Sequence, residues 1–181
     1  MSSEALNSMP SGTKPIRIMH ILHRFATGGL ENGVVNIVNE LTAPAYQHCI
    51  VSVTEADESY KQRVSNKEVT FLDLRKKEGK DVSVFWRAYK AMRVFKPDVL
   101  HTRNLSALEF LLPGFIARVP LRVHSEHGRD QSDVDGNNLK NQRLRRYLYP
   151  FAHRLVALSQ ETQRYVLDKV GVDAGKVELI C

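Results

Sequence analysis

Gly28 and Gly29 stand directly before a stretch with helical spacing, and glycines in that position could bind an anion. Glycines let backbone N–H groups approach an anion closely, and the start of a helix favours negative charge. The pair could therefore contact a phosphate or a nucleotide-sugar. A tight turn that needs a positive φ explains the same spacing at least as well. Spacing alone leaves both interpretations open.

His127 follows a predicted strand and precedes Gly128, and its imidazole is the second group that could do chemistry. An imidazole near its ordinary pKa can donate a hydrogen bond to a substrate oxygen or share a proton at neutral pH. A loop histidine satisfied by backbone groups is an equally good interpretation. His101, which lies inside another predicted strand, is interpreted as a buried structural histidine.

The glycine loop departs from the dinucleotide-binding pattern G-x-G-x-x-G. That pattern needs its first two glycines two positions apart, whereas Gly28 and Gly29 are adjacent and Gly33 stands four residues beyond them. Glu55 lies 22 residues beyond Gly33, where a ribose-binding acid would stand, and we interpret this spacing as coincidence. The glycine spacing therefore does not predict NAD binding, and the sequence also lacks a phosphate loop of the G-K-S/T type.

Histidine and cysteine spacing does not predict a metal centre. His124 and His127 are three positions apart, which on a strand directs their side chains to opposite faces. The two cysteines, Cys49 and Cys181, form no zinc pattern, and the sequence has no H-E-x-x-H. We therefore expect no metal and no cofactor.

The segment 138–154 is basic and contains no acid, with leucines and tyrosines between its charges. Its cations are Lys140, Arg143, Arg145, Arg146 and Arg154. Such a helix can lie on an anionic membrane surface or contact nucleic-acid phosphates, or it can be a solvated helix face packed by its apolar side chains. Four acids precede it and would line the same edge of a sheet, which argues against nucleic acid as a partner. They are Glu126, Asp130, Asp133 and Asp135.

Alternating apolar and amphipathic stretches must position these groups. The apolar runs 16–22, 49–53, 69–72, 99–102, 121–125, 155–158 and 177–180 are predicted strands. The stretches 30–41, 82–95, 107–118, 138–149 and 160–169 are predicted helices, the third one kinked or restarted at Pro113. The helix 82–95 is expected to bury Val82, Phe85, Trp86, Tyr89, Met92 and Phe95.

This alternation predicts an α/β fold with a Rossmann-like, doubly wound, mostly parallel sheet. Ligands of such sheets bind beyond the carboxyl ends of the strands. The loops after the first, fourth and fifth strands should therefore converge at one edge.

Chain length, composition and net charge indicate the class of protein and its compartment. The chain has 181 residues, 43% hydrophobic and 25% charged, which fits one globular domain at about 150 residues per domain. We expect a flexible tail over residues 1–15, without a secretory signal, and one domain over 16–181. The two cysteines fit a reducing, cytoplasmic compartment. A net charge of +6 favours anionic partners.

Four motifs, in this order, resemble family-4 glycosyltransferases: GGLENGVVNIVNEL, PDVLHTRN, VHSEHGRD and VALSQET. The resemblance covers about residues 16–180. The chain resembles one subgroup of this family more closely, the sugar transferases of bacterial exopolysaccharide and PEP-CTERM sorting clusters. The segments RFATGGLENGVVN, GKDV, HTRNLSALE and EHGRDQSDVDG carry that similarity.

The resemblance implies a GT-B architecture, in which two Rossmann-like domains hold the active site between them. This chain would be the N-terminal, acceptor-side domain, and the C-terminal donor domain would be absent from it. The full-length protein would be a retaining hexosyltransferase that needs no metal, and the isolated chain would be inactive. The alternative is a non-catalytic α/β module that binds an anionic membrane or a glycan.

The resemblance also implies roles for particular residues. His127 would contact the transferring sugar near its reacting carbon and support an oxocarbenium-like transition state. Gly28 and Gly29 would approach the donor diphosphate. The acceptor pocket would be shaped by Arg24, Asn32, Arg103, Asn104, Arg129 and Asp130. A membrane-docking face would comprise Lys140, Arg143, Arg145 and Arg146. The partners implied are a nucleotide-sugar donor, a lipid-linked or glycan acceptor and the inner membrane, which the protein would bind peripherally.

Overall fold

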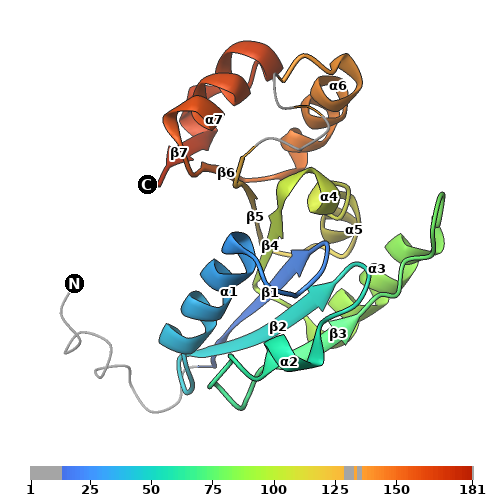
Figure 1. Cartoon of the computed structure of the whole chain (residues 1–181), viewed down its shortest axis with the longest axis vertical. Coiled ribbons are helices and arrows are strands. Elements are labelled where there is room, and N and C mark those ends of the chain that lie inside the picture. The colour runs from blue at the N-terminus through green and yellow to red at the C-terminus, as the bar shows by residue number, and fades with distance from the viewer. Residues whose placement is uncertain (1–13, 129–132, 134–135, 181) are drawn as a thin grey trace.

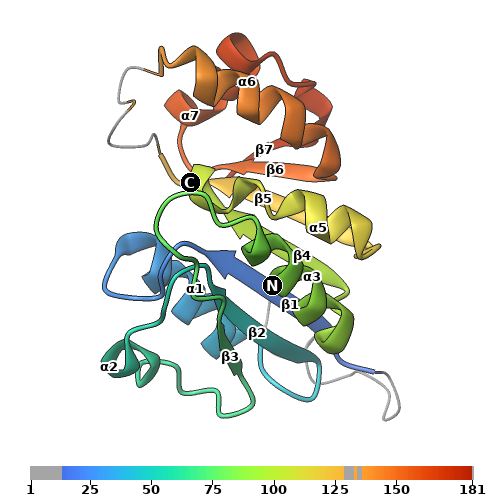
Figure 2. The same cartoon turned by 90° about the vertical axis from the view of Figure 1, so that its right-hand side faces the viewer.

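Seven strands form one parallel sheet in the order β3-β2-β1-β4-β5-β6-β7. The computed structural model describes residues 14–128, 133 and 136–180. The strands are β1 (Ile16–Leu22), β2 (Tyr46–Ser52), β3 (Thr70–Asp73), β4 (Val99–Arg103), β5 (Leu121–Glu126), β6 (Arg154–Ala157) and β7 (Val177–Leu179). Figure 2 shows them stacked from β3 at one end to β7 at the other. The predicted doubly wound α/β fold is confirmed.

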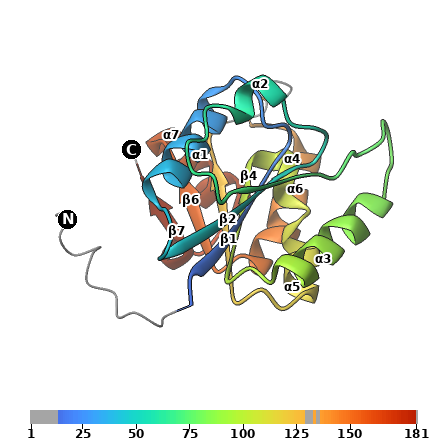
Figure 3. The same ribbon diagram turned by 90° about the horizontal axis from the view of Figure 1, so that it is seen from below.

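Helices cover both faces of this sheet. They are α1 (Gly29–Glu40), α2 (Glu58–Lys61), α3 (Ser83–Phe95), α4 (Asn104–Leu108), α5 (Leu111–Ile116), α6 (Leu139–Leu148) and α7 (Gln160–Arg164). Short helical turns follow as η3 (Tyr149–Phe151), the π-helical η4 (Tyr165–Val170) and η5 (Ala174–Lys176). Figures 1 and 3 both place α1 and α7 on one side of the sheet and α3, α5 and α6 on the other.

The direction in which strands are added to the sheet reverses between β1 and β4. From β1 the chain builds outward through β2 and β3, then crosses to β4 and builds outward the other way. Such a reversal opens a crevice beyond the carboxyl ends of the two central strands, where ligands of these folds bind. Apolar residues pack on both faces of the sheet: Met19, Val51 and Leu100 are buried in a cluster with α3, while Leu22 and Ile50 are buried in a cluster with α1.

The helix predicted over 82–95 is present, but it buries a different face from the one expected. Val84, Ala88 and Met92 are its buried residues, whereas Val82 is 79% exposed and Trp86 is 58% exposed. Small and slender side chains let the helix lie close to the sheet. Its aromatic side is therefore turned away from the sheet, toward α5 and α6.

The helix predicted over 107–118 is divided into α4 and α5. The first begins three residues earlier than expected, directly after β4. The break comes at Glu109 and Phe110 and not at Pro113, which is the third residue of α5. A proline in the first turn of a helix costs little because the N–H it lacks would have had no partner there. The stretch 160–169 likewise divides, into α7 and η4.

Candidate active site

Arg103, the last residue of β4, is buried at the carboxyl edge of the sheet with 1% of its surface exposed. Its Nη2 donates hydrogen bonds to Nδ1 of His20 at 3.1 Å and to Nδ1 of His101 at 3.0 Å. Its Nη1 is buried and has no hydrogen-bond partner among the described residues. Burial lowers the pKa of Arg103 to about 9, so the guanidinium is still charged at neutral pH.

A chain of imidazoles holds this guanidinium. The carbonyl oxygen of Leu41 accepts a hydrogen bond from Nε2 of His48 at 2.6 Å. A carbonyl can only accept, so Nε2 of His48 carries the hydrogen and its Nδ1 accepts from Nε2 of His20 at 3.0 Å. The Nδ1 atom of His20 is then free to accept from Arg103. On the other side, Nδ1 of His101 accepts from Arg103, and its Nε2 donates to the Ser125 hydroxyl.

These three histidines are uncharged at neutral pH. Burial lowers the pKa of His20 and of His101 well below the ordinary value, and the charge of Arg103 lowers both further. Burial also lowers the pKa of His48, although its hydrogen bond to Leu41 acts in the opposite direction. His101 is half-buried and belongs to this network. Besides the structural role predicted for it, it accepts a hydrogen bond from Arg103. The network thus positions a cation with neutral acceptors.

His127 follows β5, and its main chain is anchored to the start of α4. The backbone N–H of His127 donates to Oδ1 of Asn104 at 2.7 Å. Asn104 has a φ of 58°, in the left-handed region that asparagine tolerates better than most residues. The Nε2 atom of His127 is buried without a hydrogen-bond partner among the described residues. Burial, and then the charge of Arg103, lower the pKa of His127 to about 4.

The glycine pair opens α1 with bare backbone. No side chain caps the helix, and Gly28 has an extended φ of −176°. Gly29 is not among the glycines with positive φ, so the tight-turn interpretation is wrong. Crowding does not require glycine either: a Cβ at Gly29 would meet nothing within 4 Å. At Gly28 a Cβ would meet only the carboxylate of Glu31, which folds back over the helix start and is the end of a flexible side chain.

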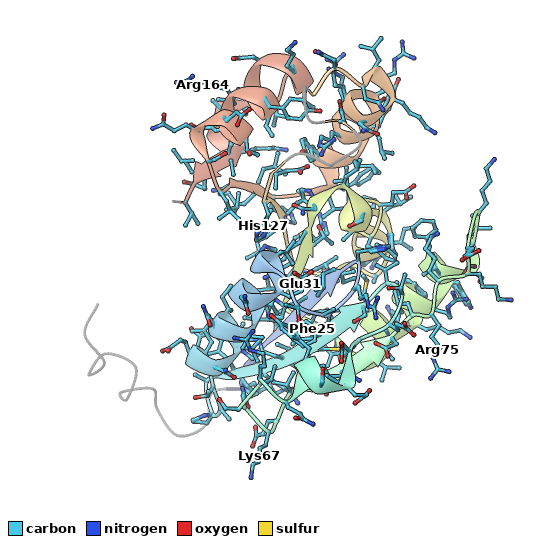
Figure 4. All side chains as sticks on the ribbon, in the orientation of Figure 1. Phe25, Glu31, Lys67, Arg75, His127 and Arg164 are labelled. Atoms are coloured by element: carbon cyan, nitrogen blue, oxygen red, sulfur yellow. The ribbon has the colours of Figure 1, made fainter. Side chains whose placement is uncertain are left out.

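These groups gather at one edge of the sheet. Figure 4 shows Glu31 and His127 on the same edge of the sheet. The charge of Arg103 interacts with both side chains. The structure therefore brings together Gly28, Gly29, Arg103, Asn104 and His127, as the sequence predicts. The arrangement offers a helix start without a side-chain cap, a buried cation that contacts no carboxylate among the described residues, and an uncharged imidazole, a set suited to an anionic ligand.

Two predicted acceptor residues, Arg24 and Asn32, are not part of this group, and two others cannot be placed. Arg24 is exposed and lies 3.8 Å from the exposed carboxylate of Glu55. The Oδ1 atom of Asn32 accepts hydrogen bonds from Tyr60 and Arg63, both at 2.7 Å, which ties α1 to the segment around α2. Arg129 and Asp130 lie outside the described residues.

The prediction of a membrane-docking role for Arg145 is wrong. Its side chain is buried, and it donates to both carboxylate oxygens of Glu126, at 2.8 and 3.2 Å. Tyr149 donates to the same carboxylate at 2.6 Å. Burial raises the pKa of Glu126, but the hydrogen bonds and charges of His124 and Arg145 outweigh this and hold it at about 2. A buried ion pair of this kind is a structural element of the core.

Of the remaining predicted docking residues, Lys140 and Arg143 are exposed on α6. Arg146 is also exposed, but its Nε donates to the carbonyl oxygen of Val170 at 2.9 Å. Sequence reasoning overlooked His20, His48 and Ser125. The signal was available, because a histidine inside an otherwise apolar strand must find a polar partner across the sheet. Among the described residues, no three histidine, cysteine or acidic side chains form a group that could hold a metal.

Comparison with known proteins finds a family model that matches most of this chain. The family described as Glycosyltransferase Family 4 matches residues 27–181. No curated protein matches the chain. Among solved structures, HepE of Anabaena in complex with UDP and glucose is similar with a TM-score of 0.69 at 18% identity, and the match covers 91% of this chain and 44% of that one.

Two further structures share the fold. A glycosyltransferase of Rickettsia africae has a TM-score of 0.66 at 14% identity, over 93% of this chain and 43% of that one. The lipopolysaccharide outer core galactosyltransferase WaaB has a TM-score of 0.64 at 12% identity, over 90% and 44%. The chain thus spans less than half the length of these proteins. At such identities the likeness shows the fold, here the Rossmann-like fold found in these glycosyltransferases.

Proposed function

We propose a role in glycosyl transfer for this chain on one premise: it belongs to Glycosyltransferase Family 4. The chain supplies one half of an enzyme that moves a sugar from a nucleotide-sugar to an acceptor. The observation that carries the proposal is the pairing of a bare helix start with the buried, unpartnered Nε2 of His127 at the carboxyl edge of the sheet.

The donor diphosphate approaches the start of α1. Gly28 and Gly29 expose backbone N–H groups there, and neither backbone conformation nor packing accounts for glycine at position 29. A diphosphate is stabilised by such N–H groups and by the positive end of the helix dipole. HepE was solved in complex with UDP-glucose, and this supports a nucleotide-sugar as the donor.

His127 contacts the transferring sugar. Because its pKa is lowered to about 4, the side chain is an uncharged imidazole at neutral pH. An uncharged imidazole does not repel the positive charge that develops on an oxocarbenium-like transition state. Its buried Nε2 can form one hydrogen bond to a sugar oxygen, fixed in place before the reaction begins. Transfer proceeds with retention at the anomeric carbon and without a metal.

The acceptor is a lipid-linked or polysaccharide glycan. Arg24 is the exposed predicted residue next to this edge, and Asn104 and Asn32 position their surroundings through the hydrogen bonds described above. Arg129 and Asp130 belong to the same proposal on sequence alone. The family resemblance of the motifs to transferases of exopolysaccharide clusters supports this acceptor class.

An anionic membrane surface is the proposed site of action. Lys140 and Arg143 are exposed on α6. The same helix borders an apolar groove of about 440 Å³ between α3, α5 and α6, lined by Trp86, Tyr89 and Leu144 among others. Cations next to exposed aromatic side chains suit a headgroup interface. No helix among the described residues is long and apolar enough to span a membrane. The same groove supports the alternative function, a non-catalytic module that binds membrane.

A transfer assay separates these functions. In a two-domain enzyme that contains this chain, transfer of labelled sugar from a panel of nucleotide-sugars is measured for wild type, His127→Ala and His153→Ala. His153 is the matched control, because it precedes β6 at the opposite edge of the sheet. We expect turnover to fall well over tenfold in His127→Ala only. Equal turnover in wild type and His127→Ala contradicts the proposed role of His127. Membrane binding without transfer of any sugar by the wild type favours the alternative.

A further inference from the structure

The two arginines that are buried among the described residues have different partners. Arg145 pairs with Glu126 through two charge-assisted hydrogen bonds, so its charge is compensated inside the protein. Arg103 is more deeply buried, and both partners of its Nη2 are imidazoles. Among the described residues no carboxylate oxygen lies within 4 Å of it. A buried charge that contacts no carboxylate is costly, and we infer that the fold keeps it for a ligand.

The imidazole chain explains how Arg103 stays in place without being neutralised. Each histidine is held in one uncharged tautomer, because the hydrogen bonds from the Leu41 carbonyl to the Ser125 hydroxyl leave only one assignment. His20 and His101 are adjacent in register on β1 and β4, and Arg103 is in register with Ser125 on β5. His20 on β1 and His101 on β4 therefore both accept from Nη2, and Ser125 on β5 fixes the ring of His101. The two N–H groups of Nη1 are left without an acceptor among the described residues.

The surroundings of Arg103 identify the kind of ligand. Its charge interacts with Glu31 at the start of α1 and with His127 after β5. The carboxylate of Glu31 lies next to Gly28, at the helix start that an anion would approach. A second buried and unpartnered donor or acceptor, Nε2 of His127, belongs to the same edge. An anion with several oxygens satisfies these groups together.

We propose that Arg103 binds a phosphoryl group of a substrate through Nη1, with His20, His48 and His101 as its positioning residues. This inference rests on the proposed function, since the phosphoryl group belongs to a substrate of glycosyl transfer. A phosphoryl oxygen accepts hydrogen bonds from the N–H groups of Nη1 and brings a negative charge into contact with the guanidinium. The carboxylate of Glu31 moves aside from Gly28 as the phosphoryl group enters.

Two substrates of glycosyl transfer carry a phosphoryl group. In one it is the diphosphate of the nucleotide-sugar, and in the other it is the phosphate that links a glycan acceptor to its lipid. Inorganic pyrophosphate and a short isoprenyl monophosphate are the probes that represent them. Their binding to the 181-residue chain is measured by calorimetry, together with that of UDP-glucose.

Two variants give the decisive comparison. Arg103→Met removes the guanidinium, and Arg93→Met removes an exposed arginine of α3 and is the control for net charge. We expect at least a tenfold weaker affinity for one of the two probes in Arg103→Met, and the wild-type affinity in Arg93→Met. Loss confined to pyrophosphate assigns Arg103 to the donor, and loss confined to the isoprenyl phosphate assigns it to the acceptor. Equal affinities for both probes in wild type and Arg103→Met overturn the proposal.

A second measurement covers the case in which Arg103→Met does not fold. In the wild-type chain with labelled arginine, the Nη resonances of Arg103 are followed by NMR while each probe is added. We expect them to shift with one of the probes, and unchanged resonances at saturation overturn the proposal. If UDP-glucose binds while Arg103 is unaffected by every phosphate compound, this inference fails and the proposed function stands. If no compound binds, both fail.

Discussion

The carboxamide oxygen of Asn104 accepts a 2.7 Å hydrogen bond from the backbone N–H of His127. This contact joins the first residue after β4 to the first residue after β5. It fixes the main chain of His127 at the carboxyl edge, beside Arg103. The left-handed backbone of Asn104 is part of the same arrangement, since it begins α4 directly at the end of the strand.

Replacing Asn104 separates its two contributions. Asn104→Ala loses the hydrogen bond and places an alanine at a φ of 58°, whereas Asn104→Gly loses only the hydrogen bond. We expect Asn104→Ala to lower the free energy of unfolding by about 2–3 kcal/mol, of which about 1–2 kcal/mol is backbone strain. Asn104→Gly should be the less destabilised variant. Urea unfolding measures both, and a glycine variant less stable than the alanine variant contradicts this account.

The buried carboxylate of Glu126 should make stability depend on pH. Its pKa in the folded chain is about 2, below the ordinary value of 4.5, so the folded state favours the ionised form. The resulting stabilisation, of order 3 kcal/mol, is fully present above about pH 5 and is lost as the pH falls from 4.5 toward 2. Unfolding free energies measured between pH 7 and pH 3 test this.

Two variants serve as the comparison for that pH series. Glu126→Gln should remove this part of the acid dependence, and it should also cost stability at pH 7 because Arg145 would be left buried without its counter-charge. Glu58→Gln, at an exposed carboxylate, should leave the pH profile as in wild type. An unchanged profile in Glu126→Gln is the result that this explanation cannot accommodate.

His127 should titrate at unusually low pH. Its pKa of about 4 in the folded chain lies below the ordinary value of 6.5. As the pH falls below 6.5 the unfolded chain therefore takes up a proton that the folded chain does not, and the folded state is destabilised until the pH reaches about 4. NMR titration of the His127 ring should show a midpoint near pH 4. A midpoint near 6.5 would show that the ring is not desolvated as described.

Membrane docking by α6 should depend on its exposed cations and not on Arg145. The variant with Lys140→Gln and Arg143→Gln should sediment less with vesicles that contain anionic lipid. Trp86→Ala should have the same effect through the apolar groove, because Trp86 is 58% exposed there. A variant with Lys14→Gln and Lys67→Gln, at exposed positions outside the groove, is the control for charge. Equal sedimentation of all variants removes the docking proposal.

The sequence predicts the fold well, because each buried strand of a parallel sheet is a short apolar run between helices. The exact ends of the elements depend on tertiary contacts. Strand β2 begins three residues before its apolar run, at Tyr46, because those residues pair in register with β1. The orientation of α3 could not be predicted either, since its sequence has two apolar sides and only the neighbouring α5 and α6 decide which one faces the sheet.

The site is predicted in part. Loops after parallel strands converge whatever their sequence, so Gly28, Arg103 and His127 could be grouped in advance. The partner of each charged side chain could not be predicted from the sequence. Arg103 and Arg145 have the same side chain, and only the fold shows that one meets imidazoles while the other meets a carboxylate. Local sequence does not record which partner a long side chain will reach across a sheet.

The central claim is that the edge formed by the α1 start and His127 receives a nucleotide-sugar. The direct measurement is an NMR titration of the 181-residue chain, with labelled amides and histidine rings, using UDP-glucose. We predict that the amides of Gly28 and Gly29 and the ring of His127 shift together along one binding curve, while the ring of His153 is unaffected. Saturable binding that leaves these three residues unshifted, or no binding of UDP-glucose or other nucleotide-sugars, contradicts the account.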